Sequence, residues 1–334
     1  MNVTWLIGNG FDLACGLKTS YPDFYKSTYV QNNTTNQIYQ DINANMESWT
    51  DFEVALGELS YKIFNHVIDK QHFIFDVTQV YSDLGKYLEI QQERNTLTDG
   101  NIEKFKEYLI HFYNYVDPAH KKLIWDQLYN QQSPRKFGHS FVVFNYTNTF
   151  SRFLEQINAD IPINNNAKAV IRKSDICFIH GSLEKGIIVG CDNQSQYNFE
   201  LLGTSSYLLD KSITNNERGT LNIENAVRLI KSTNLFVIFG MSLGETDQRW
   251  WNEIASRVIS NPANRIVIFN YIGAIEGNDN YIKVAKSHEI KQKFIDSLGD
   301  DFTSEQIEDI RQKIIVSNRH DMFDLKSKTP STVQ

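Results

Sequence analysis

The chain has 334 residues and a formal net charge of -7, with acidic and basic residues interspersed, so nothing indicates a nucleic-acid-binding face. Its three cysteines lie far apart without a Cys-x-x-Cys spacing, which favours neither a disulfide framework nor a structural zinc site. No apolar run approaches the roughly 20 residues that cross a bilayer, and no basic residue precedes the first apolar segment. We therefore expect a cytoplasmic protein without a signal peptide or a membrane partner.

The first predicted element is a buried strand at residues 3–7, which runs directly into Gly8–Asp12. Five apolar or β-branched residues before a Gly-x-Gly turn indicate a strand that ends abruptly. Because Gly8 and Gly10 have no Cβ, their backbone N–H groups can approach a ligand closely. In open α/β sheets such a loop leads to a helix whose N-terminus binds phosphate. A tight turn without a ligand explains the same residues equally well.

Residues 20–130 carry a helical pattern without strand alternation. Apolar residues recur at helical spacing over 51–69, 73–88 and 102–116, and Pro118 begins a further short helix. This block follows the first strand and precedes all the others, so it interrupts the sheet. We therefore divide the chain into a nucleotide-binding domain, residues 1–18 and 138–334, and an inserted helical domain, residues 19–137.

After residue 138, short apolar runs alternate with helical patterns. Strands are predicted at 140–145, 175–179, 235–239 and 265–269, with a last strand at 314–316, and residues 192–220 are expected to be polar loops. Strands that are apolar at every position and separated by helices are typical of a parallel sheet covered on both faces. The predicted fold class is therefore α/β: a Rossmann-like, mostly parallel sheet with a large helical insertion after its first strand.

Four of these strands end in glycine or polar residues: Gly8–Asp12, Asn145–Asn148, His180–Ser182 and Gly240–Glu245. In sheets of this type, ligands bind beyond the carboxyl ends of the strands. The four ends together therefore predict a nucleotide-sized site at one edge of the sheet. Turn chemistry alone is the alternative, although the end of the strand at 265–269 lacks this character.

Taken in order, these motifs resemble the sirtuin-like NAD-binding fold, and especially its NAD-consuming branch in bacterial anti-phage systems. Gly8–Asp12, Trp49–Glu53 and Phe239–Asp247 are closer still to the AbiH family of phage abortive-infection proteins. The resemblance spans residues 3–272. It implies an effector that hydrolyses NAD at the nicotinamide–ribose bond and arrests the infected cell, with NAD as the substrate and no metal ion.

Position by position, the resemblance implies that Asn145 holds the reacting ribose and that His180 is the general base. The resemblance also carries Gly8, Gly10 and Ser242 over to cofactor binding, and the strand ends add Asn9, Phe11, Asp12, Tyr146, Gly181, Gly240 and Glu245 to the predicted cofactor-binding set. A histidine can take a proton near neutral pH, and an asparagine amide both donates and accepts hydrogen bonds. The zinc-binding cysteine pairs of protein deacylases are absent, so the resemblance does not extend to deacylation.

Each polar candidate also has a purely structural interpretation. His180 is compatible with a turn histidine bonded to backbone, and Asn145 with an Asx-type strand terminator. Asp12 either contacts a ligand or caps the next helix. Asp51 and Glu53 stand at a helix start, where N-capping competes with a position of Glu53 over the nucleotide pocket.

Two other functions stay open at this point. The pocket could sense NAD or an ADP-ribose derivative without turnover, with the helical block transmitting the signal. A metal-dependent nuclease would use Asp12, Asp51 and Glu53, but the acidic net charge counts against it. We also expect a homo-oligomer, and a phage-encoded trigger or a partner defence protein.

Overall fold

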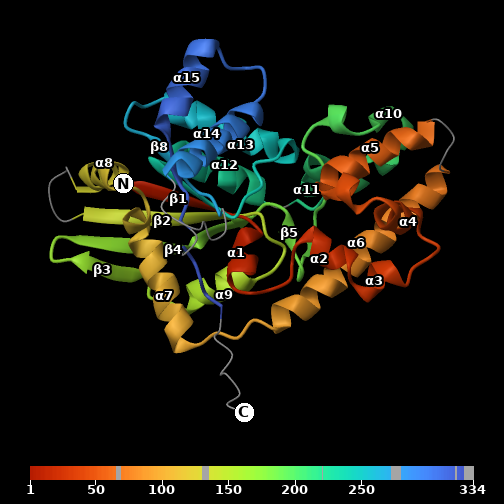
Figure 1. The fold of residues 1–334 in the computed structure, drawn as a ribbon, viewed down its shortest axis with the longest axis horizontal. Coiled ribbons are helices and arrows are strands. Elements are labelled where there is room, and N and C mark those ends of the chain that lie inside the picture. Colours follow the sequence, from red (N-terminus) through yellow and green to blue (C-terminus); the bar gives the residue numbers. More distant parts are fainter. Residues whose placement is uncertain (65–68, 130–134, 220, 272–279, 320–321, 327–334) are drawn as a thin grey trace.

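The centre of the molecule is a seven-stranded sheet in the order β3-β4-β2-β1-β7-β8-β9 (Figure 1). The computed structural model describes residues 1–64, 69–129, 135–219, 221–271, 280–319 and 322–326. The strands are β1 (Asn2–Ile7), β2 (Arg135–Val143), β3 (Asp160–Asn164), β4 (Ala167–Phe178), β7 (Leu235–Phe239), β8 (Arg265–Phe269) and β9 (Ile314–Ser317). Only the β3–β4 pair is antiparallel among these neighbours. The predicted α/β class with a mostly parallel sheet is therefore confirmed.

The central strands end at the same edge of the sheet. Ile7 of β1 pairs with Val143 of β2 on one side and with Phe239 of β7 on the other. Every residue of β7 is buried, as are the last five of β1, because helices cover both faces. The loops that follow β1, β2 and β7 consequently leave the sheet side by side.

The order of the strands reverses next to β1. From β1 the chain continues to β2 and β4 on one side, then returns to β7, β8 and β9 on the other. Neighbouring loops diverge at such a reversal and leave a crevice, where open α/β sheets bind their ligands. The loops after β1 and β7 therefore border the crevice expected at this reversal.

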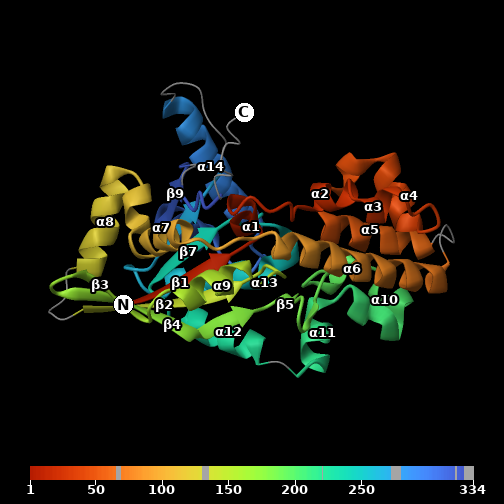
Figure 2. The same ribbon diagram turned by 90° about the horizontal axis from the view of Figure 1, so that it is seen from below.

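The block between β1 and β2 is helical, as its apolar spacing predicts. Helices α2 to α6 lie together at one end of the molecule, whereas α7 and α8 lie beside the sheet at the other end (Figures 1 and 2). The helices of this block are α1 (Gly10–Ala14), α2 (Tyr21–Tyr25), α3 (Thr28–Gln31), α4 (Gln37–Ala44), α5 (Phe52–Phe64), α6 (Lys70–Glu93), α7 (Asp99–Ile110) and α8 (Pro118–Tyr129).

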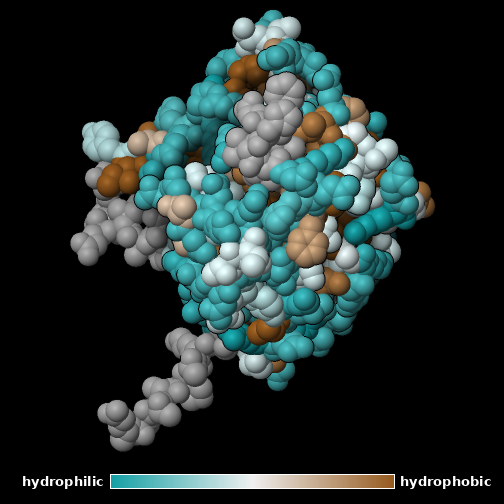
Figure 3. All heavy atoms as spheres, turned by 90° about the vertical axis from the view of Figure 1, so that its right-hand side faces the viewer, coloured by the Kyte–Doolittle hydropathy of each residue, from teal (hydrophilic) through white to brown (hydrophobic). Residues whose placement is uncertain are grey.

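Hydrophobic packing crosses the predicted domain boundaries. Phe105 and Leu109 of α7 belong to the cluster on one face of the sheet, together with Trp5 of β1. Helices α2 to α6 form another cluster, and residues 189–209 from the later half of the chain complete it. The side of the molecule with α4, α5, α6 and α10 is mainly hydrophilic, with hydrophobic side chains scattered over it (Figure 3).

The prediction of polar loops over residues 192–220 is wrong. This segment forms short helices, including α10 (Phe199–Leu202) and α11 (Lys211–Glu217). Asp210 caps α11 by accepting hydrogen bonds from the N–H groups of Ser212 and Ile213. Elements this short carry too few apolar residues to show a period.

The remaining helices separate or flank the later strands. They are α9 (Thr149–Gln156), α12 (Asn222–Ser232), α13 (Gln248–Ile259), α14 (Asn280–Asp296) and α15 (Ser304–Lys313). A small hairpin of β5 (Gly181–Ser182) and β6 (Gly186–Ile187) follows β4. Among the described helices, none has the length and apolar character needed to span a bilayer.

Candidate functional site

A cavity of about 430 Å³ lies at the carboxyl edge of the sheet, where α2, α5 and α6 cover the loops after β1 and β7. It is lined by Gly8, Asn9, Gly10, Asp12, Leu13, Thr19, Ser20, Tyr21, Pro22, Thr50, Asp51, Glu53, Leu84, Leu88, Phe144, Asn145, Tyr146, Thr147, His180, Gly240, Met241, Ser242, Thr246 and Asp247. Its volume falls within the range of small-molecule sites, roughly 300–1,000 Å³. The structure thus brings three of the four predicted strand ends, and His180 of the fourth, around one cavity.

Three glycines bring the loops after β1 and β7 into contact. A Cβ on Gly10 would lie 2.4 Å from the Cα of Gly240, and one on Gly8 would lie 2.3 Å from the carbonyl oxygen of Gly240. Gly240 itself has a φ of +70°, which L side chains rarely adopt. These positions therefore require glycine for backbone packing.

The predicted use of the Gly8 and Gly10 N–H groups for ligand binding is wrong. The N–H of Gly8 donates to the Phe239 carbonyl at 2.9 Å, and that of Gly10 to the Gly240 carbonyl at 3.0 Å. The side chain of Asn9 is also engaged, because its amide nitrogen donates to the Thr19 carbonyl and its oxygen accepts from the Thr19 hydroxyl. The loop shapes the cavity, and its glycine N–H groups are already used.

Asp12 and Asn145 line the cavity, and both side chains are almost fully buried. One oxygen of Asp12 accepts a hydrogen bond from the Thr147 hydroxyl at 2.7 Å. The other, and both amide atoms of Asn145, are buried without a hydrogen-bond partner in the described structure. Burial raises the pKa of Asp12 to about 6, opposed by the neighbouring Thr147, Asn145 and Thr149 side chains. Asp12 does not cap α1, whose N-cap is Asn9.

His180 lies at the end of β4 and is held by an acid. Its Nε2 lies 3.0 Å from Oδ1 of Asp247, and both side chains are more than nine-tenths buried. The ring of Phe144 meets the imidazole edge to face, with centroids 5.2 Å apart. These contacts fix the ring orientation at the cavity wall.

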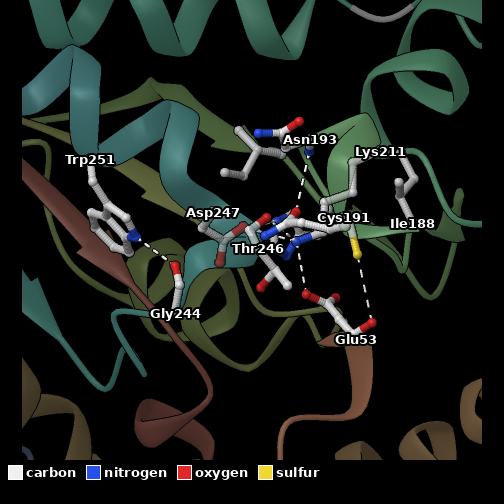
Figure 4. Close-up of polar contacts among 12 residues, drawn as sticks. Glu53, Ile188, Cys191, Asn193, Lys211, Gly244, Thr246, Asp247 and Trp251 are labelled. Atoms are coloured by element: carbon white, nitrogen blue, oxygen red, sulfur yellow. Dashed lines mark hydrogen bonds and ion pairs between the residues drawn. The ribbon is translucent and has the colours of Figure 1, made fainter. Parts of the chain in front are cut away.

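A buried lysine that does not line the cavity binds that same acid (Figure 4). Nζ of Lys211 donates to Oδ1 of Asp247 at 2.9 Å, to Oε2 of Glu53 at 2.9 Å and to the carbonyl of Thr246 at 3.0 Å. An ammonium group has three protons, so all of them are used. Lys211 thus joins α11, the inserted helix α5 and the segment after β7.

The charges in this cluster stabilise one another. Burial alone would raise the pKa of Asp247, but Lys211 and His180 outweigh it and hold that pKa well below its usual range. Burial alone would lower the pKa of Lys211, but Asp247, Glu53 and Asp192 hold it well above its usual value. Nearby, burial raises the pKa of Asp192 to about 7, although Lys211 opposes that rise.

The structure distinguishes the roles of Asp51 and Glu53. Asp51 accepts a hydrogen bond from the N–H of Val54 and so caps α5, while Glu53 points to Lys211 and lines the cavity. Asp51 is therefore the helix cap, and Glu53 is the residue of this pair that reaches Lys211 at the cavity.

The loop after β7 is held in an unusual conformation. Leu243 is buried with a φ of +55°, which is rare for a branched side chain. The indole N–H of Trp251 in α13 donates to the carbonyl of Gly244 at 2.9 Å and anchors the loop (Figure 4). Ser242 lines the cavity from this loop.

Three predicted binding residues lie away from this cavity. Phe11 is fully buried among the rings of Phe105 and Phe150, because the first turn of α1 directs it into the core. Gly181 lies in the β5–β6 hairpin, where it lines a second cavity of about 420 Å³ on the far side of Tyr146. Glu245 is solvent-exposed. Their motifs are close to the site, but these three residues do not belong to the cavity lining.

The carboxylates of the nuclease alternative have separate partners. Asp12 binds Thr147, Asp51 caps a helix and Glu53 pairs with Lys211. Among the residues that the structure describes, no group of three histidine, cysteine, aspartate or glutamate side chains is arranged to hold a metal ion. The geometry gives the nuclease no support.

Three residues of the site were not predicted. Lys211 lies in a segment expected to be loop. Asp247 belongs to the motif Phe239–Asp247, and Thr147 belongs to the strand end Asn145–Asn148, but neither was predicted as a site residue. No spacing in the sequence links residues 53, 180, 211 and 247, and only the fold brings them together.

Comparison with known proteins identifies the family. A family model described as "Bacteriophage abortive infection AbiH" matches residues 4–271, which include every residue lining the cavity. No match was found among curated proteins. The chain therefore belongs to the AbiH family and to bacteriophage defence by abortive infection.

Proposed function

We propose that this protein hydrolyses NAD at the nicotinamide–ribose bond and thereby arrests the infected cell. The observation that carries the proposal is the cavity, whose lining includes Asp12, Asn145 and His180 from the ends of three strands. Asp12 and Asn145 also have buried polar atoms without a hydrogen-bond partner, which is costly, so a polar ligand that reaches them would stabilise the site. Ribose hydroxyls supply both donors and acceptors.

The reaction requires one water and releases one proton. Water oxygen forms a bond to C1′ of the nicotinamide-bearing ribose while the C1′–nitrogen bond breaks. The electron pair of that bond neutralises the pyridinium nitrogen of the leaving nicotinamide, and the proton of the attacking water passes to His180. The products are nicotinamide, ADP-ribose and a proton.

The residues have separate tasks in this scheme. Asn145 and the free oxygen of Asp12 bind the ribose hydroxyls, and such contacts accelerate the reaction if they tighten in the oxocarbenium-like transition state. His180 orients and deprotonates the water. The carboxylates of Glu53 and Asp247 line the cavity and favour positive charge developing on the ribose.

The test measures NAD in infected cells, because the trigger is then supplied by the phage. Cultures expressing the wild-type chain, His180→Ala, Asn145→Ala or His72→Ala are infected with a panel of phages. NAD, nicotinamide and ADP-ribose are quantified by mass spectrometry. His72 is a solvent-exposed histidine of α6 and serves as the control.

We expect NAD to fall, and nicotinamide with ADP-ribose to rise, in cultures that the wild-type or His72→Ala chain protects. The other two variants should lose both protection and NAD depletion. Protection by the wild-type chain at constant NAD refutes hydrolysis. Tight NAD binding by the purified chain in that case would favour the sensor.

A further inference from the structure

The Asp247 carboxylate receives two hydrogen bonds on one oxygen. Lys211 approaches Oδ1 at 2.9 Å and His180 Nε2 approaches it at 3.0 Å. An ionised carboxylate only accepts hydrogen bonds, so the nitrogen of His180 that faces it must carry a hydrogen. A neutral imidazole has one N–H, which leaves the other ring nitrogen, Nδ1, unprotonated.

The ionised form of Asp247 depends on Lys211. Asp247 is 6% exposed, and a buried carboxylate without a cation takes up a proton in preference to staying charged. Lys211 is the cation within hydrogen-bond distance of it, and it is itself 2% exposed. Glu53 supplies the second carboxylate on Lys211 from the inserted helix α5. Asp192 is a further acid beside Lys211 and His180.

We propose that Lys211 is a positioning residue that acts through Asp247 to fix His180 as the Nε2–H tautomer, with Nδ1 as the base. Lys211 does not line the main cavity, whereas Asp247 and His180 do. Lys211 therefore affects the reaction without touching the substrate. This inference rests on the role proposed above for His180.

The direct test is the protonation pattern of the His180 ring, which needs no NAD. Protein labelled with ¹⁵N-histidine gives distinct nitrogen shifts for the two neutral tautomers and the imidazolium, and His180→Ala assigns the resonances. In the wild-type chain the proton should lie on Nε2 of His180, the nitrogen that faces Asp247, and Nδ1 should carry none. In Lys211→Met the Nε2–H form should no longer be the main species.

Two further variants distinguish a change in the His180 tautomer from a general folding defect. Lys211→Met leaves the carboxylates of Glu53 and Asp247 without their cation, and combining it with Glu53→Gln removes one of these two charges. This double variant should show the same loss of the Nε2–H form. Lys313→Met removes another buried lysine, which binds Asp309 and the Val258 carbonyl, and should leave the His180 spectrum as in wild type. An imidazolium or an Nδ1–H ring in the wild-type chain overturns the proposal. So does a wild-type spectrum in both Lys211 variants.

If the chain hydrolyses NAD, a kinetic consequence follows. Lys211→Met should lower kcat at least about 100-fold, because loss of the correct histidine tautomer removes base catalysis. Asn145, Asp12 and Glu53 are untouched in that variant, so KM should change less than about threefold. A loss confined to KM contradicts the assignment. Absence of NAD cleavage by the wild-type chain would refute the proposed function while the ring spectrum still decides the tautomer.

Discussion

The contact between the loops after β1 and β7 can be tested with Gly240→Ala. The new Cβ would lie 2.6 Å from the Cα of Gly10 and 2.7 Å from its nitrogen, both backbone atoms that cannot rotate away. Holding alanine at a φ of +70° costs about 1 kcal/mol, and forcing the two loops apart adds about 1–3 kcal/mol. We therefore expect the free energy of unfolding to fall by about 2–4 kcal/mol.

Two glycines elsewhere separate the two contributions. Gly219, which follows the C-cap of α11, has a φ of +58° but nothing within 4 Å of its Cβ position, so Gly219→Ala should lose only about 1 kcal/mol. Gly85 lies within α6 with the same free space and no positive φ, so Gly85→Ala should gain up to about 1 kcal/mol.

Urea unfolding followed by tryptophan fluorescence measures all three variants under one condition. The expected order of stability is Gly85→Ala, wild type, Gly219→Ala and Gly240→Ala. If Gly240→Ala is no less stable than Gly219→Ala, the loops do not pack as described, and the argument for how the cavity is shaped fails.

Three other expectations concern the charged residues and the assembly. Burial raises the pKa of Asp12 from its ordinary value of 3.8 to about 6 in the folded chain, so the cost of burying its charge grows as pH rises from 3.8 to about 6. Asp12→Asn should therefore raise the free energy of unfolding by about 2 kcal/mol more at pH 7.5 than at pH 4.5, and an equal effect at both would contradict this. Lys211→Met should lower the free energy of unfolding in urea by about 3–5 kcal/mol, because it leaves the buried carboxylates of Glu53 and Asp247 without their cation. A loss under about 1 kcal/mol would show that these carboxylates are solvated. We expect a homo-oligomer by mass photometry, and a monomer alone at micromolar concentration would contradict it.

The sheet and its functional edge were predictable because their pattern is local. Strands such as Leu235–Phe239 are apolar at every position, because helices cover both faces of the sheet and bury the side chains on each. The glycine and polar residues that follow them mark the edge directly. The cavity position followed from this pattern together with the rule for open α/β sheets.

The direction of individual side chains was not predictable in the same way. Phe11 follows Gly10 in the loop motif, yet the first turn of α1 points it into an aromatic cluster. Gly8 and Gly10 stand where ligand-binding glycines are expected, but the backbone of Gly240 occupies the space beside them. A motif places a residue near a site, and packing decides what its atoms contact.

Lys211 illustrates a second limit. It is one lysine in a polar segment, with no apolar period around it and no fixed spacing from its partners at positions 53 and 247. Its role arises only when the inserted helix α5, the segment after β7 and α11 meet. Buried charge clusters assembled from distant segments leave no mark in the local sequence.

The most direct test of the central claim is nicotinamide release by the protein itself. The chain is purified from infected cultures that it protects, incubated with NAD, and compared with His180→Ala prepared from infected cultures in the same way. We predict nicotinamide and ADP-ribose in equal amounts from the wild-type chain, and at least about 100-fold less from the variant. Equal release by the two proteins, or none from the wild-type chain, would contradict the account.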